Sequence, residues 1–104
     1  MIYPHAVTVW RRVEEGRSVK WERKLLARCR FEPTCGAKPD GHADESERSA
    51  DLIVKTRGKP FGEGDKAVLG SSDSSEPPKG AFVVESVSMV SIGGAPLHWE
   101  AQLR

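Results

Sequence analysis

Long apolar runs are absent from this chain of 104 residues. A helix that crosses a bilayer needs about 20 consecutive apolar residues, and no stretch of the sequence approaches that length. The opening residues, MIYPHAVTVW, also lack the basic start and the apolar core of a signal peptide. We therefore expect a protein that is made and kept in a cytosol and has no part in a membrane.

An excess of charge of one sign is also absent. Sixteen basic residues stand against 15 acidic residues, which gives a net charge of +1. A nucleic-acid-binding domain usually has a marked basic excess or a basic stripe. The local pairs Arg11–Arg12 and Arg28–Arg30 have acidic neighbours, as the solvated face of a strand does. We expect at most non-specific proximity to DNA.

Cysteine is scarce, with Cys29 and Cys35 as its two representatives, and in a cytosol both are expected to be reduced thiols. A zinc site would combine them with His42, but their spacing matches no structural zinc arrangement and a fourth ligand is not evident. Cys29 lies among alternating apolar residues, where a small buried thiol is the better interpretation. We predict no metal and no cofactor, and a zinc protein is the weakest alternative.

A catalytic constellation is missing as well. His98 and Glu100 have the spacing that begins the zinc deaminase signature, but the Pro-Cys-x-x-Cys that completes the signature does not follow. The serines within 71–75 lack the strained turn that presents a nucleophile. The glycines around KPFGEGD match no phosphate-binding loop, and Gly64-Asp65 is better interpreted as a turn. We predict no catalytic residues, and therefore that the chain is not an enzyme.

Alternation of apolar and polar residues is the strongest pattern that is present. In KLLARCRFE (24–32) the apolar positions share one face: Leu25, Ala27, Cys29 and Phe31. In LHWEAQLR (97–104) they are Leu97, Trp99, Ala101 and Leu103. A period of two predicts half-buried strands, and it places His98 and Glu100 together on a wet face without any chemistry.

The remaining segments also favour strands. Runs rich in β-branched residues occur at 5–13, 50–56, 66–69 and 81–92, and 5–13 is expected to pair with 21–32 as a hairpin turning at Gly16. About six short strands without a helical stripe are typical of an antiparallel β-barrel or sandwich. We predict one all-β domain over residues 1–104, with Phe31 and Phe82 in a modest core whose ends are covered by the three tryptophans.

Two long polar loops, 33–50 and 71–80, separate these strands. Neither has the apolar side chains needed to join a core. Loops longer than about 12–15 residues are uncommon in compact domains unless they serve a function or are disordered. We predict that both loops contact partners, and the candidate contact residues are Cys35, Lys38, Asp40, His42, Asp44, Glu45, Glu47, Arg48, Asp73, Glu76 and Lys79.

Several short motifs occur in a familiar order: IYPHAVTVW at the start, Trp21 and Leu25 in the next strand, G-D-x-x-V-x-G at 64–70, VESV at 84–87 and LHWE at 97–100. Taken together, the chain resembles small proteins from the structural-gene modules of tailed bacteriophages and prophages. These are neck proteins: head–tail connector, head-closure (stopper) or head–tail joining proteins. The two polar loops match no pattern of this family.

The resemblance implies a small β-barrel that assembles as a homo-oligomeric ring in the virion neck, in the cytoplasm of the bacterial host. Its partners would be the portal or adaptor protein and the tail proteins of the same phage. The family has no catalytic residues to transfer. Loops that order on docking would give specific contacts, so deleting residues 36–48 is expected to leave a folded monomer but no infectious particles.

Two alternatives stay open. Within the virion, the chain would instead be a tail terminator or another minor tail protein. In a different class, it would be a small β-barrel that binds single-stranded nucleic acid by stacking bases on Trp10 and Trp21 beside Arg11, Arg12 and Arg23.

Overall fold

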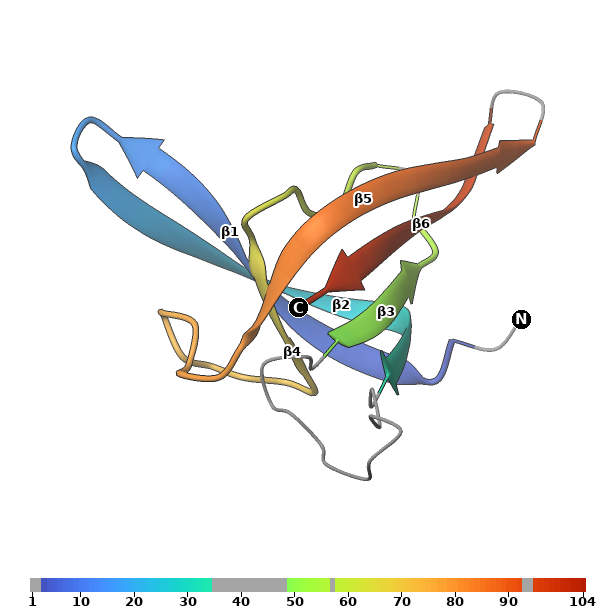
Figure 1. Ribbon diagram of the computed structural model, residues 1–104, viewed down its shortest axis with the longest axis horizontal. Helices are drawn as coiled ribbons and strands as arrows, with labels where there is room; N and C mark the ends of the chain where they lie inside the picture. Colours follow the sequence, from blue (N-terminus) through green and yellow to red (C-terminus); the bar gives the residue numbers. More distant parts are fainter. Residues whose placement is uncertain (1–2, 35–48, 57, 93–94) are drawn as a thin grey trace, which may run out of the picture.

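Six antiparallel strands close into one barrel in the computed structural model, which describes residues 3–34, 49–56, 58–92 and 95–104, without the side chains of 34, 92 and 95–97. The strands are β1 (His5–Glu15), β2 (Ser18–Thr34), β3 (Ser49–Val54), β4 (Lys66–Leu69), β5 (Phe82–Ile92) and β6 (Ala95–Leu103). Their order around the barrel is β1-β2-β3-β6-β5-β4, and the ribbon is drawn in Figure 1. The prediction of a small all-β barrel is confirmed.

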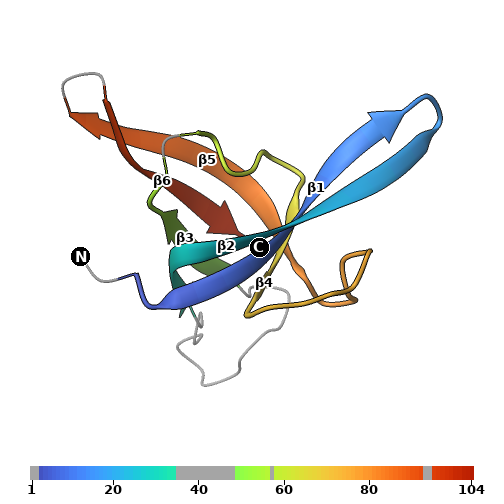
Figure 2. The same ribbon diagram turned by 180° about the vertical axis from the view of Figure 1, so that it is seen from behind.

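Two hairpin arms project from the same end of the barrel. β4 pairs with β1 only over Thr8–Trp10, and β3 pairs with β2 only from Cys29 onward, so residues 11–24 continue as a two-stranded ribbon, the first arm. Residues 88–92 of β5 and 95–98 of β6 form the second arm in the same way. The two arms diverge as a V in Figures 1 and 2, and the molecule measures 42 × 41 × 22 Å.

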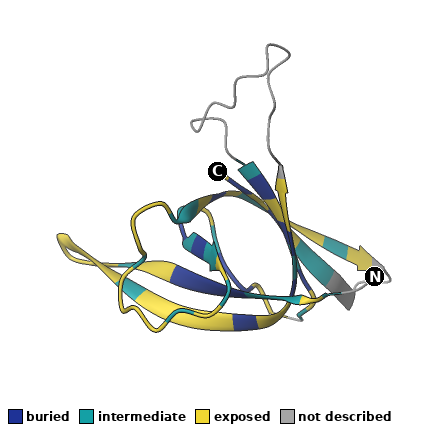
Figure 3. Cartoon of the chain, turned by 90° about the horizontal axis from the view of Figure 1, so that it is seen from below, coloured by how far each residue is buried: buried dark blue, intermediate teal, exposed yellow. Residues whose placement is uncertain are grey.

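The first arm ends in a two-residue turn. Glu15 lies opposite Ser18, and Gly16 between them has a φ of 61°. A tight hairpin turn needs positive φ at its first central position, which glycine adopts without strain. The turn therefore forms where the sequence predicts it. Most side chains of this arm are exposed, as the view of Figure 3 makes visible.

The core is built from the inward positions of all six strands. Its buried members are Val7, Val9, Leu26, Cys29, Phe31, Ala50, Leu52, Val54, Phe61, Ala67, Val84, Ala101 and Leu103. Phe31 and Phe82 meet edge to face, with ring centroids 5.4 Å apart. Phe61 comes from the segment before β4 rather than from a strand, and its 1% exposure places it fully within the core.

The sequence predicts one apolar face in β2, and this prediction is wrong for its first half, Leu25 and Ala27. β2 has one residue more than β1 between Leu26 and Cys29, which makes a β-bulge. An extra residue exchanges the inward and outward positions on its two sides. Leu26 and Cys29 are both buried, whereas Leu25 is 52% exposed and Ala27 is also exposed. Phe31, beyond the bulge, faces the core as predicted.

The terminal strand follows its predicted alternation more closely. Ala101 and Leu103 are buried and Glu100 and Gln102 are exposed, while Trp99 is half-buried near the end of the barrel. The side chain of Leu97 lies outside the described residues. The prediction that this stretch is a strand is confirmed.

The first predicted loop, 33–50, is shorter than the sequence indicates, because the flanking strands extend into it. β2 continues to Thr34 and β3 begins at Ser49. These two positions lie at the end of the barrel opposite the arms, since His5 pairs with Cys29 there while Glu15 pairs with Ser18 at the arm tip. The part of the chain that the structure describes contains no helix long and apolar enough to cross a bilayer.

Candidate functional site

His98 and Glu100 form a pair on the outer surface of β6. His98 Nε2 lies 3.0 Å from Glu100 Oε1, and the side chain of His98 is 15% exposed and that of Glu100 47%. Among the described residues no group of three histidine, cysteine, aspartate or glutamate side chains is placed to hold a metal ion. The pair is therefore a contact between two side chains on the protein surface, of the kind that contributes little to stability.

The thiol of Cys29 faces the core. Its Sγ donates to the carbonyl oxygen of Leu26 at 3.4 Å, across the bulge. Burial raises the pKa of Cys29 from the ordinary 9.0 to about 11, so the thiol keeps its proton at neutral pH. This matches the interpretation of a small structural cysteine. Cys35 and His42, the other members of the considered zinc set, lie outside the described residues.

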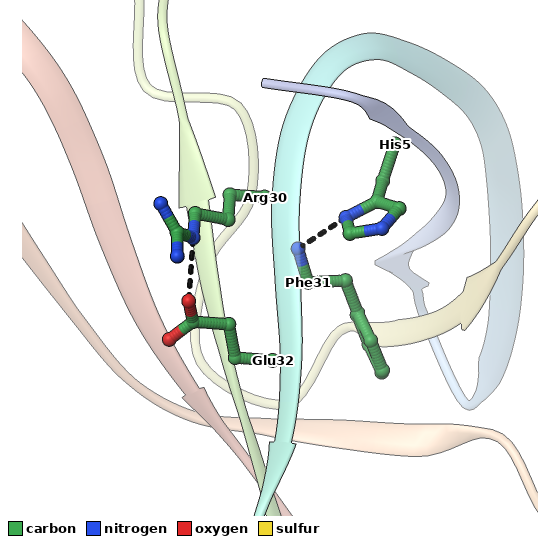
Figure 4. Close-up of polar contacts among 4 residues, drawn as sticks. All are labelled: His5, Arg30, Phe31 and Glu32. Atoms are coloured by element: carbon green, nitrogen blue, oxygen red, sulfur yellow. Dashed lines mark hydrogen bonds and ion pairs between the residues drawn. The ribbon is translucent and has the colours of Figure 1, made fainter. Parts of the chain in front are cut away.

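His5 joins the first two strands where the bulge disturbs their pairing. The backbone N–H of Phe31 donates to His5 Nδ1 at 3.0 Å, drawn in Figure 4. In the same view Arg30 Nε and Glu32 Oε1 form an ion pair on the outer surface of β2. Because Nδ1 accepts, the imidazole is held as the tautomer with its proton on Nε2, so His5 has a structural role.

The polar loop 71–80 is exposed but fixed to the outside of β1. Thr8 Oγ1 donates to the Gly70 carbonyl at 2.7 Å and accepts from the Ser72 N–H at 3.0 Å. Trp10 Nε1 donates to the Ser74 carbonyl at 2.9 Å. As predicted, this loop adds no side chain to the core, but its backbone supplies hydrogen-bond partners that fix it to β1.

Trp10 consequently has a different place from the one predicted. Val7 and Val9 point into the barrel, so Thr8 and Trp10 point outward, and Trp10 is nonetheless fully buried. The hydrogen bond to Ser74 places loop 71–80 beside the indole on this outer surface. Trp10 does not close an end of the core, and it offers no free ring face.

Asp65 links the base of the first arm to β5, the strand that continues into the second arm. Its Oδ1 accepts from the Arg12 N–H of the first arm at 2.9 Å, and its Oδ2 accepts from the Gly62 N–H at 2.7 Å. The Asp65 carbonyl accepts from the Val84 N–H of β5 at 2.8 Å, and the Gly64 N–H donates to the Val84 carbonyl at 2.9 Å. Gly64, with φ of 89°, permits the turn. The predicted turn at Gly64-Asp65 is thus the junction between the first arm and β5.

An acidic face lies on the outer surface of the barrel, centred on β3 and β6. The register places Glu32, Asp51 and Gln102 side by side, and the neighbouring row contains Ile53 and Glu100. A hollow of about 340 Å³ opens on this surface. The outward residues that line it, here named the acidic face, are Glu32, Asp51, Ile53, Ser86, Ser88, Glu100 and Gln102.

The predicted contact residues divide into two groups. Asp73, Glu76 and Lys79 are exposed on the fixed loop 71–80. The other candidates lie outside the described residues: Cys35, Lys38, Asp40, His42, Asp44, Glu45, Glu47 and Arg48. The acidic face and the Asp65 junction were not foreseen from the sequence, since strands distant in sequence contribute to each.

Comparison with known protein families, with curated proteins and with solved structures finds no match to this chain. Its function is accordingly argued from its own residues and geometry.

Proposed function

We propose that this chain is a structural virion protein of a tailed phage or prophage, and that it forms part of the head–tail connector by ring assembly and loop-mediated docking. One observation supports this most directly: different segments of the chain project from the two ends of the barrel. Both arms leave one end, while loop 71–80 and the residues that flank 35–48 leave the other. A ring subunit between a portal and a tail needs separate surfaces for the neighbours above, below and beside it.

The composition of the two ends fits this role. The first arm exposes most of its side chains and adds little to the core, so it is free to bind another chain. Loop 71–80 presents Asp73, Glu76 and Lys79 from a backbone that is already fixed by Thr8 and Trp10. A preorganised loop loses less conformational entropy on docking than a free one.

The test is to place a stop codon at Trp10 in the phage or prophage that encodes the chain. Loss of a connector protein is expected to yield tails that are not joined to heads, and no infectious particles, with recovery on supply of the intact protein in trans. A synonymous change at Arg11 is the matched control. Normal particles from the stop mutant would refute the proposal, and joined particles with tails of irregular length would favour the tail-terminator alternative.

The nucleic-acid alternative depends on fewer residues than the sequence indicated. Trp10 is fully buried, so stacking would rest on Trp21, which is half-buried beside Arg12 on the first arm. Salt-dependent binding of single strands that is lost in Trp21→Ala would favour this function. Unchanged binding in that variant, or none by the wild type, would count against it.

A further inference from the structure

The first arm is the most basic element of the described chain. Between residues 11 and 24 it has six cations, Arg11, Arg12, Arg17, Lys20, Arg23 and Lys24, against three carboxylates, Glu14, Glu15 and Glu22. The whole chain has a net charge of only +1, so the remainder is net negative. Arg17 and Lys20 lie exposed at the tip, next to Val19, whose side chain is 43% exposed. Glu14 lies directly opposite Val19 in the hairpin, so carboxylates as well as cations surround this apolar residue, and the basic excess belongs to the arm as a whole.

The acidic face offers the complementary surface. Three carboxylates, Glu32, Asp51 and Glu100, border its hollow, together with serine and amide side chains and the half-buried Ile53. Glu32 is paired with Arg30 and Glu100 contacts His98, but Asp51 has no ion pair with any described residue. A hollow bordered by carboxylates is complementary in charge to a basic arm.

An arm cannot occupy the acidic face of its own molecule. In the order β1-β2-β3-β6-β5-β4, β6 lies across the barrel from β1, and the arm extends away from the barrel rather than back along it. Each chain therefore carries one arm and one acidic face on different sides. A contact between two different patches of identical chains is heterologous, and repeating it generates a closed ring or a filament.

We propose that the first arm of one copy docks into the acidic face of the next copy, and that this contact builds the ring. The inference rests on the proposed function for its setting in a virion neck, and it deepens that function by naming the surfaces that join the subunits. Arg17 and Lys20 of the arm lie against Asp51 and Glu100 of the neighbour.

The test uses charge reversal in the full chain, with mass measured by sedimentation velocity and native mass spectrometry. At about 1 mM protein, where even millimolar association is populated, and at about 0.1 M salt, the wild type is expected to form oligomers. These should dissociate at about 1 M salt, where screening shortens the range of charge interactions to about 3 Å. Reversing the arm (Arg17→Glu with Lys20→Glu) or the face (Asp51→Lys with Glu100→Lys) should weaken association at least about tenfold.

Mixing the two reversed proteins gives the sharpest result. An acidic arm then meets a basic face, and a basic arm meets an acidic face, so equimolar mixtures should form oligomers in which the two variants alternate. Lys59→Glu and Glu63→Lys change exposed charges outside both surfaces and serve as matched controls that should assemble like the wild type. Circular dichroism and thermal melting identify any variant that fails to fold.

The outcomes separate this inference from the proposed function. A wild type that stays monomeric at low salt, or reversed variants that assemble normally or fail to complement each other, overturns the arm-to-face contact. Even if that contact is overturned, a stop mutant that produces heads without joined tails would support the connector role. Conversely, normal particles from the stop mutant alongside the expected complementation would refute the connector role and leave the contact standing.

Discussion

At the scale of single residues, Trp99 combines packing with an unsatisfied polar atom. Its ring is half-buried, and the indole N–H is buried and has no hydrogen-bond partner among the described residues. Removing the whole ring in Trp99→Ala should lower the free energy of unfolding by about 2–4 kcal/mol, because the packed ring is lost. Trp99→Phe should stay within about 1 kcal/mol of the wild type, since removing the unpaired donor offsets the smaller ring.

Urea denaturation of both variants measures these differences. His98→Ala is a suitable neighbour control, expected to change stability by less than about 1 kcal/mol because it removes only a surface pair. Equal losses in Trp99→Phe and Trp99→Ala would show that the indole N–H carries no penalty in the folded protein.

Cys29 gives the protein a pH dependence in the alkaline range. The pKa of its thiol is about 11 in the folded chain against an ordinary 9.0, so the folded state holds the proton more tightly than the unfolded state. Its stabilising effect is complete below pH 9 and is lost as the pH rises from 9 toward 11. The free energy of unfolding should fall over this window in the wild type and fall less in Cys29→Ala.

Urea titrations at a series of pH values provide this comparison, and the difference between the two proteins removes the contribution of lysines and of Tyr3. If the free energy of unfolding fell equally steeply with pH in both proteins, the assignment of this pH dependence to Cys29 would be wrong. Thiol reagents should likewise modify Cys29 only after unfolding, because it is fully buried.

At the scale of elements, loop 71–80 depends on the hydroxyl of Thr8. Thr8→Val keeps the shape of the side chain but removes both bonds, to the Gly70 carbonyl and from the Ser72 N–H. We expect a loss of about 1–3 kcal/mol and faster amide hydrogen exchange at residues 71–76. Hydrogen exchange read by mass spectrometry tests this, and unchanged protection of the loop would indicate that Trp10 and Arg23, which donate to the Ser74 and Ser72 carbonyls, hold it without the hydroxyl.

The first arm should be separable from the stability of the barrel. Deleting Glu14, Glu15, Ser18 and Val19 retains the Gly16-Arg17 turn and shortens the hairpin by two residue pairs in register. Because all four side chains are exposed, the free energy of unfolding should change by less than about 1 kcal/mol. A larger loss by urea denaturation would mean that the arm supports the barrel rather than standing free.

The elements themselves were predictable, and their details were not. Alternation in LHWEAQLR identifies β6 and the inward positions of Ala101 and Leu103, because residues two apart on a strand point to the same face. In KLLARCRFE, Leu25 and Leu26 are equally apolar, so the sequence does not reveal that a bulge turns Leu26 inward. Hydrogen bonds from Trp10 and Thr8 to loop backbone leave no sequence pattern, because every residue has the same backbone groups.

At the scale of the whole molecule, Asp65 joins the first arm to β5 through one carboxylate and one peptide group. Asp65→Ala leaves the N–H groups of Arg12 and Gly62 without their acceptor, which should lower the free energy of unfolding by about 1.5–3 kcal/mol. Asp65→Asn retains one acceptor oxygen, so its free energy of unfolding should lie between those of the wild type and Asp65→Ala.

Loosening this junction should also widen the distribution of distances between the arms. Spin labels at Arg17 and Ser91, both exposed, allow pulsed electron resonance to measure it. A distribution in Asp65→Ala as narrow as in the wild type would mean that β4 and Phe61 fix the arms without the carboxylate.

The sequence leaves open whether six strands form a sandwich or a barrel, because closure depends on pairs that are distant in sequence. β1 meets β4 across more than half of the chain, and β3 meets β6 across nearly half of it. The acidic face has the same origin, since four strands contribute to it, so no local motif marks it. Exposure of Asp73, Glu76 and Lys79 follows from polarity alone and was predictable.

The position of β6 between β3 and β5 also sets an order of events during synthesis. The hairpin of β1 and β2 is local and can form early, but β3 and β5 each keep an open edge until β6 has left the ribosome. Until then the basic arm exists without the surface centred on β3 and β6. Incomplete chains therefore lack the outer surface centred on β3 and β6, which exists only in the finished barrel.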